Sequence, residues 1–442
     1  MGSRSWLAVL MLVVVAGASV PHVSYTDQQV PVPWSKRDLI ATARRVITTH
    51  PAFIGDNALR SKYLAYARSI AKRVRKPLPY WRLAEDEDLV LNYLHDPHTT
   101  LWADYSPNYD ADLLPVGFYW AKGGLIVYRE RGTPAAVHTG DRVLAVGGVP
   151  EGHLVRRFER FFGGSAVWIK TLVGEDLPFG TILRWLGFVH QGQVQLLLER
   201  PSGARYRLTM ALVPVDLQTY QAYYLGQAAF DDRFEAPPGL PEPEGSSFFA
   251  WRLTPDYGVF WLTECNDTPA YKAAVDAFFK AVRAAHVHYV VIDLQNNPGG
   301  NSAVADALLA HLPIRPKYAG DFGPQAPIAD TFAGPVYVLT NASTFSSGVD
   351  VAETLSEASD GVLVGQPTGW PSGGWGNVQG FDTPDGIMGY QVSMEFVQAL
   401  NGKVTPALMP RIPVPLTASD VQQGVNPVAQ WFSQIGTPHV HT

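Results

Sequence analysis

The chain has 442 residues, of which 46% are hydrophobic and 12% aromatic, enough to form the cores of two or three globular domains. A formal net charge of -6 leaves no basic stripe for nucleic acid and no polybasic membrane surface. The single Cys265 excludes an internal disulfide and a cysteine-based zinc site, and no HExxH or P-loop string is present. We therefore expect no nucleic-acid partner.

The N-terminus carries a short apolar run. Arg4 precedes WLAVLMLVVVAGA, and the small residues at positions 16–18 follow its core. This run is nearer the length of a signal-peptide core than of a membrane span. We expect a signal peptide at residues 1–18 that is cleaved after Ala18, and the alternative is an anchor that is kept. The first reading predicts an exported protein, periplasmic or extracellular, without stable membrane insertion.

The region 19–107 is predicted to be helical. Amphipathic spacing indicates helices at 35–50, 56–74 and 80–94, the first opened by a capping box at Ser35 and Asp38. The third ends in LHDPHTTLW, where the Asp-Pro pair breaks the helix and leaves His98 on an irregular turn. Because an imidazole titrates near neutrality, His98 is a candidate general base.

Short strands and turns replace the helices over residues 108–215. The strings VGFYW, LIVYRE and VQLLL indicate strands, and a hairpin is expected around Pro201-Ser202-Gly203. Residues 132–150 resemble the Gly-Asp-x-Val-Leu core of a degenerate PDZ-like module, a type of module that binds a peptide at a sheet edge. Residues 216–247, acidic and rich in Pro and Gly, are expected to form a linker.

The last domain, 248–435, alternates strands and helices. This order indicates an α/β domain with a mixed, largely parallel sheet covered by helices. Active sites of such sheets form at the carboxyl ends of the strands. Two loops should lie there, QNNPGGNS at 295–302 and NASTFSS at 341–347.

The second of these loops joins the buried strand VYVLT to a helix. A serine at that corner, Ser346, is a candidate nucleophile, although serines at a helix start are also common caps. The N–H of Ser347 and those of Gly299 or Gly300 could together hold an oxyanion. The plain alternative for Asn-Pro-Gly-Gly is a tight turn.

The motifs together resemble those of the C-terminal processing, or tail-specific, protease family. VVIDLQNNPGGNS is similar to the family's Asp-Leu-Arg-x-Asn-x-Gly-Gly signature, and TFSSGVDVAETL to its nucleophile helix. LHDPHTTLW is similar to the Asp-x-His-Thr string of the branch with tricorn protease and interphotoreceptor retinoid-binding protein. The resemblance implies a ClpP/crotonase-like α/β fold and a serine peptidase acting on peptides or proteins, with no metal or organic cofactor.

Two departures from the family pattern affect the expected site. Aligning the family's nucleophile on Ser346 puts Pro371 where the dyad lysine should be, and no lysine occurs between Lys317 and Lys403. The resemblance then implies a Ser-His arrangement with His98 as base. The segment 402–409, where that branch has its acid, contains no carboxylate, so Glu395, Asp382 and Asp385 all remain candidates.

The sequence thus predicts a serine-type endopeptidase with Ser346, His98 and a backbone oxyanion hole. The alternative is a catalytically weak or inactive binder of peptides or hydrophobic ligands. An esterase of another fold is disfavoured because no Gly-x-Ser-x-Gly string appears.

Overall fold

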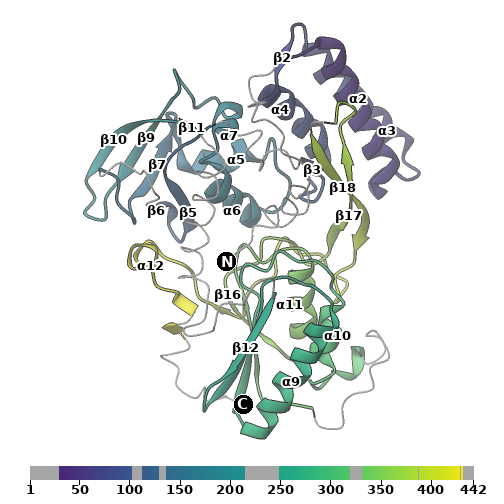
Figure 1. The fold of residues 1–442 in the computed structure, drawn as a ribbon, viewed down its shortest axis with the longest axis vertical. Helices are drawn as coiled ribbons and strands as arrows, with labels where there is room; N and C mark the ends of the chain where they lie inside the picture. Colours follow the sequence, from purple (N-terminus) through teal and green to yellow (C-terminus); the bar gives the residue numbers. More distant parts are fainter. Residues whose placement is uncertain are drawn as a thin grey trace. The chain divides into compact units, whose positions relative to one another are not determined.

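The computed structural model describes residues 29–101, 112–128, 136–214, 248–318, 331–386, 388–428 and 430–431. These residues form two compact units (Figure 1). Unit 1 holds the described residues of Ala228–Gly374 and Gln398–Thr442, and unit 2 those of Trp6–Gln227 and Trp375–Val397. The predicted signal peptide (1–18) and linker (216–247) lie outside the described residues. Within those residues, no helix has the length and apolar character needed to span a membrane.

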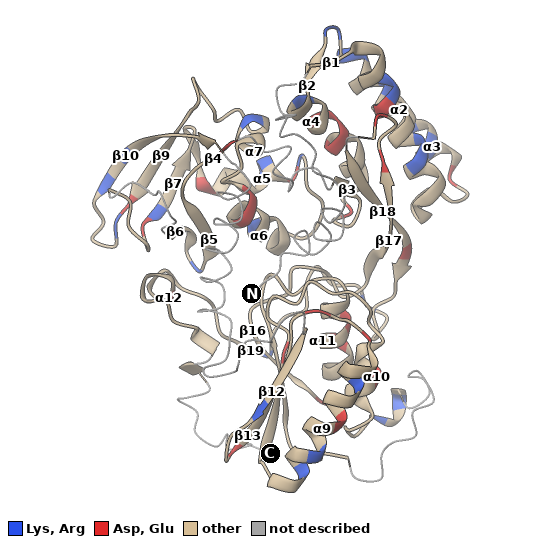
Figure 2. Cartoon of the chain, viewed as in Figure 1, with Lys and Arg blue, Asp and Glu red and all other residues tan. Residues whose placement is uncertain are grey.

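Unit 2 begins with three helices at the predicted places, α2 (Val32–Thr49), α3 (Asn57–Arg73) and α4 (Tyr80–Leu91). The capping box expected at Ser35 and Asp38 is wrong, because α2 already begins at Val32 and both side chains are buried within it. Proline at the start of α2 fits because the first turn needs no N–H. Figure 2 shows basic residues on α3 and acidic residues on α4.

A mainly antiparallel sheet follows in unit 2, with strand order β10-β9-β7-β6-β5 and β8 beside β7. Its strands are β5 (Gly117–Ala121), β6 (Gly124–Tyr128), β7 (Arg142–Val146), β8 (Val149–Pro150), β9 (Gln193–Glu199) and β10 (Arg205–Ala211). The hairpin predicted from Pro201-Ser202-Gly203 is confirmed by the pairing of β9 with β10. The PDZ-like assignment stays a prediction.

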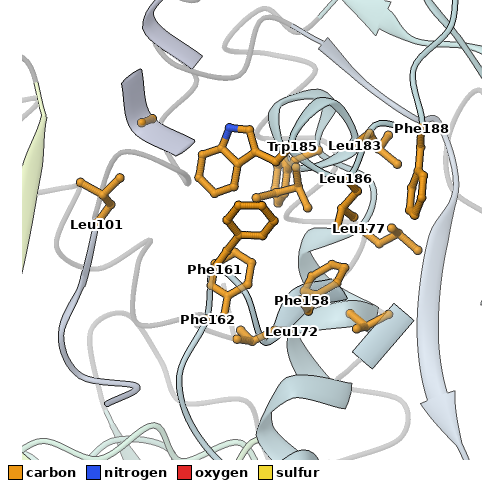
Figure 3. Close-up of a cluster of buried hydrophobic side chains, with 14 of the residues drawn as sticks. Leu101, Phe158, Phe161, Phe162, Leu172, Leu177, Leu183, Trp185, Leu186 and Phe188 are labelled. Carbon is orange, nitrogen blue, oxygen red and sulfur yellow. The ribbon is translucent and has the colours of Figure 1, made fainter. Parts of the chain in front are cut away.

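Three short helices that the sequence pattern did not indicate lie between β8 and β9. They are α5 (Leu154–Phe158), α6 (Ala166–Asp176) and α7 (Gly180–Trp185). Aromatic side chains of this region pack together, and the ring of Phe161, which follows α5, lies 5.3 Å from that of Trp185 in α7 (Figure 3). The remaining short strands of unit 2 pair two by two, β1 (Gln29–Val30) with β2 (Leu78–Pro79) and β4 (Asp112–Leu113) with β11 (Val213–Pro214).

A late hairpin completes unit 2. Its strands β17 (Gly374–Asp382) and β18 (Gly389–Val397) form a sheet with β3 (Thr100–Leu101), in the order β17-β18-β3. Tyr390 of β18 lies opposite Leu101 of β3. The hairpin therefore packs beside the strand that directly follows the turn of His98.

Unit 1 contains the α/β domain that the alternation predicted. Its sheet has the order β12-β13-β14-β15-β16-β19, with β12 antiparallel and the other strands parallel. The strands are β12 (Phe249–Leu253), β13 (Tyr257–Leu262), β14 (Tyr289–Asp293), β15 (Val336–Thr340), β16 (Val362–Gly365) and β19 (Ile412–Pro413). The helices are α9 (Pro269–Ala285), α10 (Val304–Leu309), α11 (Ser347–Ala358) and α12 (Ala418–Gln423).

This sheet is covered on both faces, which explains the apolar runs without polar alternation. Val290 and Ile292 of β14 enter one buried cluster, with residues of α9, α10 and α11. Tyr289 and Val291, which point the opposite way, enter a second cluster that includes Val428. Because β14 and β15 are parallel neighbours, the loops after them meet at one edge of the sheet.

Candidate active site

Ser346 lies at the corner between β15 and α11, as the sequence predicted. Its backbone has φ 48° and ψ -130°, a combination that an L-residue adopts only under strain. It occupies the N-cap position of α11, yet its side chain makes no capping hydrogen bond. Ser346 therefore stands at the cap position of the helix without capping it through its side chain. The strained corner is the geometry by which a strand-to-helix turn presents a nucleophile.

The Gly299-Gly300 loop packs directly on this corner. Gly299 has φ 107°, and a Cβ built there would lie 2.7 Å from both Ser346 Cβ and Ser347 N. Gly300 has φ 128°, and a Cβ there would lie 2.3 Å from the carbonyl oxygen of Cys265. Only glycine allows this close approach of two backbones. The two predicted loops are therefore in contact within unit 1.

The backbone donors at this contact are not equivalent. The N–H of Gly299 donates to Asn297 Oδ1 at 2.8 Å and is already occupied. Within the described residues, the backbone N–H groups of Gly300 and Ser347 donate no hydrogen bond of this kind. The hydroxyl of Ser347 donates to the carbonyl oxygen of Gly300 at 2.9 Å, which fixes that peptide against the start of α11.

Polar side chains lock the two loops together. Asn341 Nδ2 donates to Asn296 Oδ1 at 2.7 Å, and Asn296 N donates back to Asn341 Oδ1 at 3.0 Å. Thr344 Oγ1 donates to the carbonyl oxygen of Leu294 at 2.8 Å. These bonds satisfy buried backbone groups that the irregular loops leave open. The corner is thus held on a rigid support rather than on a mobile loop.

A buried acid lies beneath the same loops. Asp293, the last residue of β14, is fully buried, and its Oδ1 accepts the N–H of Gln295 at 3.0 Å. Burial raises the pKa of Asp293 to about 8, against the smaller opposing effect of the Gln295 bond. Asp293 is therefore protonated in the folded protein at neutral pH.

His98 lies in unit 2, on the turn that the Asp-Pro pair was expected to form. It is only 7% exposed. Burial lowers the pKa of His98, whereas the charge of Asp96 and a hydrogen bond with the backbone of Trp375 act in the opposite direction. The net effect favours the neutral imidazole, the form that a general base needs.

The three candidate acids all lie on the β17–β18 hairpin. Asp382 is exposed at the end of β17. Asp385 accepts hydrogen bonds from Tyr80 OH at 2.9 Å and Thr383 Oγ1 at 2.6 Å. Glu395 is exposed and accepts a hydrogen bond from Asn377 Nδ2 at 3.2 Å.

The sequence analysis missed two residues beside His98, namely Asp96 and His50. Asp96 Oδ1 accepts the backbone N–H of His98 at 3.0 Å, and His50 Nε2 lies 3.3 Å from Asp96 Oδ2. An aspartate two residues before a histidine, next to proline, is the signal of an Asx-turn that could have indicated Asp96. Nothing in the local pattern around His50 indicates this contact.

Within the described residues, no group of three or more His, Cys, Asp or Glu side chains could hold a metal ion. Burial raises the pKa of the Cys265 thiol far above its usual value, so the thiolate, the reactive form, is not populated. The groups that the described residues place at the corner are the Ser346 and Ser347 hydroxyls and backbone N–H donors.

Comparison with known proteins points to the same region. Residues 256–396 match the sequence family described as "Peptidase family S41". This match includes the Gly299-Gly300 loop, Ser346 and the β17–β18 hairpin, while His98 lies outside it. No curated protein matches the chain.

The solved structures of mature CPAF share the fold over most of the chain. The crystal structure of mature CPAF is 16% identical, with a TM-score of 0.63, and the match covers 92% of this chain and 97% of that chain. Mature CPAF complexed with lactacystin gives 15% identity, a TM-score of 0.62 and coverage of 92% and 98%. The photosystem II D1 C-terminal processing protease, 16% identical over 87% of this chain and 93% of that chain, gives a TM-score of 0.42.

At these identities the structural matches show the fold alone. The family match adds the type of domain, since peptidase family S41 is a family of serine peptidases. The chain therefore shares the fold of mature CPAF, and its residues 256–396 match peptidase family S41.

Proposed function

We propose that the chain is a serine peptidase that hydrolyses peptide bonds with Ser346 as nucleophile and His98 as general base. The observation that carries this proposal is the strained backbone of Ser346, at φ 48° and ψ -130°, directly against the Gly299-Gly300 loop. Strain of this kind persists where the surroundings enforce it, and it gathers at active sites. The S41 family match over the same residues supports the reaction class.

In the proposed mechanism, His98 removes the proton from Ser346 Oγ as the oxygen attacks the peptide carbonyl carbon. His98 then gives that proton to the leaving amine, and the C–N bond breaks. Water, deprotonated by His98, next attacks the acyl-enzyme and releases the new carboxylate together with the serine hydroxyl.

We assign the oxyanion hole to the N–H groups of Gly300 and Ser347. This choice between Gly299 and Gly300 rests on the bond that already occupies the Gly299 N–H. Two preorganised donors stabilise the charge that develops on the carbonyl oxygen, and losing one typically costs about 10²–10³ in turnover. Glu395, Asp382 and Asp385 remain proposals for an acid that orients the imidazole.

The first test is intact-mass spectrometry of the purified protein after exposure to a fluorophosphonate. We expect one adduct on the wild type and none on Ser346→Ala or His98→Ala, because both the nucleophile and the base are needed. Matched controls are Ser343→Ala in the same loop and His95→Ala on the exposed surface three residues before His98. Both controls should react like the wild type.

An adduct that survives Ser346→Ala would move the nucleophile elsewhere and refute the proposal. Absence of any adduct between about pH 6 and 9, the range of an ordinary imidazole titration, would favour the inactive peptide or ligand binder instead. A positive result leads to cleavage assays on peptides with free and blocked C-termini. Export, which rests on residues 4–18, is tested by N-terminal sequencing of the protein secreted by its host.

A further inference from the structure

Asp96 is the centre of a buried polar cluster in unit 2 that the proposed mechanism does not yet use. Its Oδ2 accepts short hydrogen bonds of 2.6 Å from Thr99 Oγ1 and from Ser393 Oγ. Its Oδ1 accepts the backbone N–H of His98 at 3.0 Å. The carboxylate is thus bonded to the turn that carries the base and to β18, although Ser393 is 297 residues away along the chain.

His50 adds a buried imidazole in close contact with this cluster. It is fully buried, at the end of α2, and its Nδ1 accepts the N–H of Ala52 at 3.1 Å. A ring nitrogen that accepts a hydrogen bond carries no proton, so the proton of neutral His50 is on Nε2. Nε2 is the atom 3.3 Å from Asp96 Oδ2. The ring also packs on Trp375 at 4.6 Å between centroids.

These contacts keep Asp96 ionised although it is buried. Burial alone would raise its pKa, but His50, the charge of His98 and the hydroxyls of Ser393 and Thr99 together lower it below the usual value. A buried negative charge next to an imidazole stabilises the protonated ring. Asp96 correspondingly raises the pKa of His98, partly offsetting burial.

We propose that Asp96 is the positioning residue of the base: its buried charge stabilises the His98 imidazolium, and its hydrogen bonds fix the His98 turn on β18, in contact with His50. This inference rests on the proposed role of His98 and deepens it. The role differs from that of an acid bonded to the imidazole itself, because Asp96 holds the His98 backbone. The titratable groups that face Asp96 are His50 from the end of α2 and His98 from the turn, while β18 contributes only the Ser393 hydroxyl.

The direct test replaces the charge and keeps the shape, with Asp96→Asn. Selective ¹⁵N-histidine labelling and NMR give the pKa of the His98 ring, assigned by its loss in His98→Ala. We expect the pKa of His98 to fall by about one unit in Asp96→Asn, since a close opposite charge shifts a pKa by about one to three units. Asp141→Asn is the matched control, because Asp141 is equally buried in unit 2 and accepts bonds from Tyr206 and His138.

The kinetic readout is the rate of fluorophosphonate labelling as a function of pH. In this reaction a Ser346 Oγ–P bond forms, fluoride leaves and the serine proton passes to His98. A lower pKa of His98 makes a weaker base that stays neutral to lower pH. We expect the acid limb of the Asp96→Asn profile to move to lower pH by about one unit and the plateau rate to fall at least about tenfold.

A second pair of variants keeps the inference testable if Asp96→Asn does not fold. His50→Ala removes the ring nitrogen that lies 3.3 Å from Asp96 Oδ2, whereas His50→Gln can place an amide N–H there. We expect slower labelling in His50→Ala and recovery in His50→Gln. Equal rates in wild type and His50→Ala, or an unmoved His98 pKa in Asp96→Asn, would overturn the positioning role.

The NMR readout also separates this inference from the proposed function. If the wild type does not react with the fluorophosphonate, the proposed peptidase and the positioning role both fail, even where the pKa of His98 moves. If the wild type reacts at Ser346 but Asp96→Asn keeps the same profile and the same His98 pKa, only the positioning role fails. A shift of the same size in Asp141→Asn would show a general effect of buried charge and would also refute it.

Discussion

Ser346 has a backbone conformation that glycine tolerates better than any L-residue. The strain of such a residue costs about 1–3 kcal/mol. Ser346→Gly should relieve part of it, offset by the greater freedom of glycine in the unfolded chain, whereas Ser346→Ala keeps the Cβ and the strain. We expect Ser346→Gly to be more stable than Ser346→Ala by about 1 kcal/mol, measured as a higher melting temperature, with both variants inactive.

A neighbouring serine whose backbone is not strained serves as the control for the Ser346→Gly and Ser346→Ala pair. Ser347, the next residue, begins α11 with ordinary helical geometry, so Ser347→Gly should be less stable than Ser347→Ala. The same order at both positions would contradict the strained-corner interpretation.

The buried Asp293 should make the free energy of unfolding decrease as pH rises through a defined range. Below its unfolded pKa, near 3.8, the carboxyl is protonated in both states. Between that value and about 8 only the unfolded chain ionises, so the unfolded state binds fewer protons and stability falls as pH rises, by up to about 1.4 kcal/mol per unit. Above about 8 the folded state ionises too, and the loss stops growing.

Asp293→Asn resembles the protonated acid and cannot ionise. We expect its melting temperature to decline less than that of the wild type between about pH 4 and 8, with the two curves closest at the acid end. Urea unfolding at several pH values gives the same comparison as free energies. Parallel curves across this range would show that Asp293 is ionised in the fold.

The sequence predicted some residues of the candidate site and missed others. Ser346, Gly299 and Gly300 lie in motifs whose loops follow neighbouring parallel strands, so local pattern and strand order suffice to bring them together. The strain at Ser346 and the bond that occupies the Gly299 N–H are matters of tertiary packing. The position of Asp96 in a buried polar cluster was missed because it depends on hydrogen-bond partners such as Ser393, which lies 297 residues away.

At the scale of elements, the close approach of the Gly299-Gly300 loop to its neighbours should be intolerant of a single methyl group. In Gly300→Ala the added Cβ would lie 2.3 Å from the Cys265 carbonyl oxygen, so the loop must shift. A shift of this loop displaces the proposed oxyanion donor. We expect fluorophosphonate labelling and peptidase turnover to fall by about 10² or more.

Gly402→Ala is the matched control for this change. Gly402 also has a positive φ, of 75°, but nothing lies within 4 Å of a Cβ built there. Both variants carry backbone strain, and only Gly300→Ala carries the clash. Equal loss of activity in the two would assign the effect to backbone strain alone.

The helices and strands of unit 1 were predictable because each has a strong local signal. The run at Val336–Thr340 is rich in apolar residues and buried throughout, as expected for a strand covered on both faces, and α9 has a clear amphipathic period. The helices α5, α6 and α7 gave no such signal, since two are only five and six residues long and α6 is largely apolar. The strands β17 and β18 are half exposed and stand among glycines, which masks the alternation.

At the scale of the whole molecule, the units do not follow the order of the chain. Residues Trp375–Val397 belong to unit 2, although unit 1 continues on either side of them. Local composition cannot indicate this, because the hairpin pairs with β3, almost 300 residues earlier, through backbone pairing that carries no sequence pattern. The domains predicted from the sequence are continuous segments of the chain, and their boundaries remain predictions.

The separate cores predict separate unfolding. The largest buried cluster draws its members from residues of unit 2, and the other two from residues of unit 1. Units with their own cores tend to open as cooperative blocks. We therefore expect calorimetry of the full chain to give two transitions, each assigned by one large-to-small substitution in one core.

Leu83→Ala in α4 and Leu308→Ala in α10 provide that assignment, since both leucines are fully buried. Each should lower one transition by several degrees and leave the other in place, because such a cavity costs about 2–5 kcal/mol in the unit that contains it. Fluorophosphonate labelling followed along the same heating curve should stop at the lower transition, since the proposed mechanism takes Ser346 from one unit and His98 from the other. Labelling that continues between the transitions would show that one unit alone activates the serine, and the base would then have to be sought outside the unit that melts first.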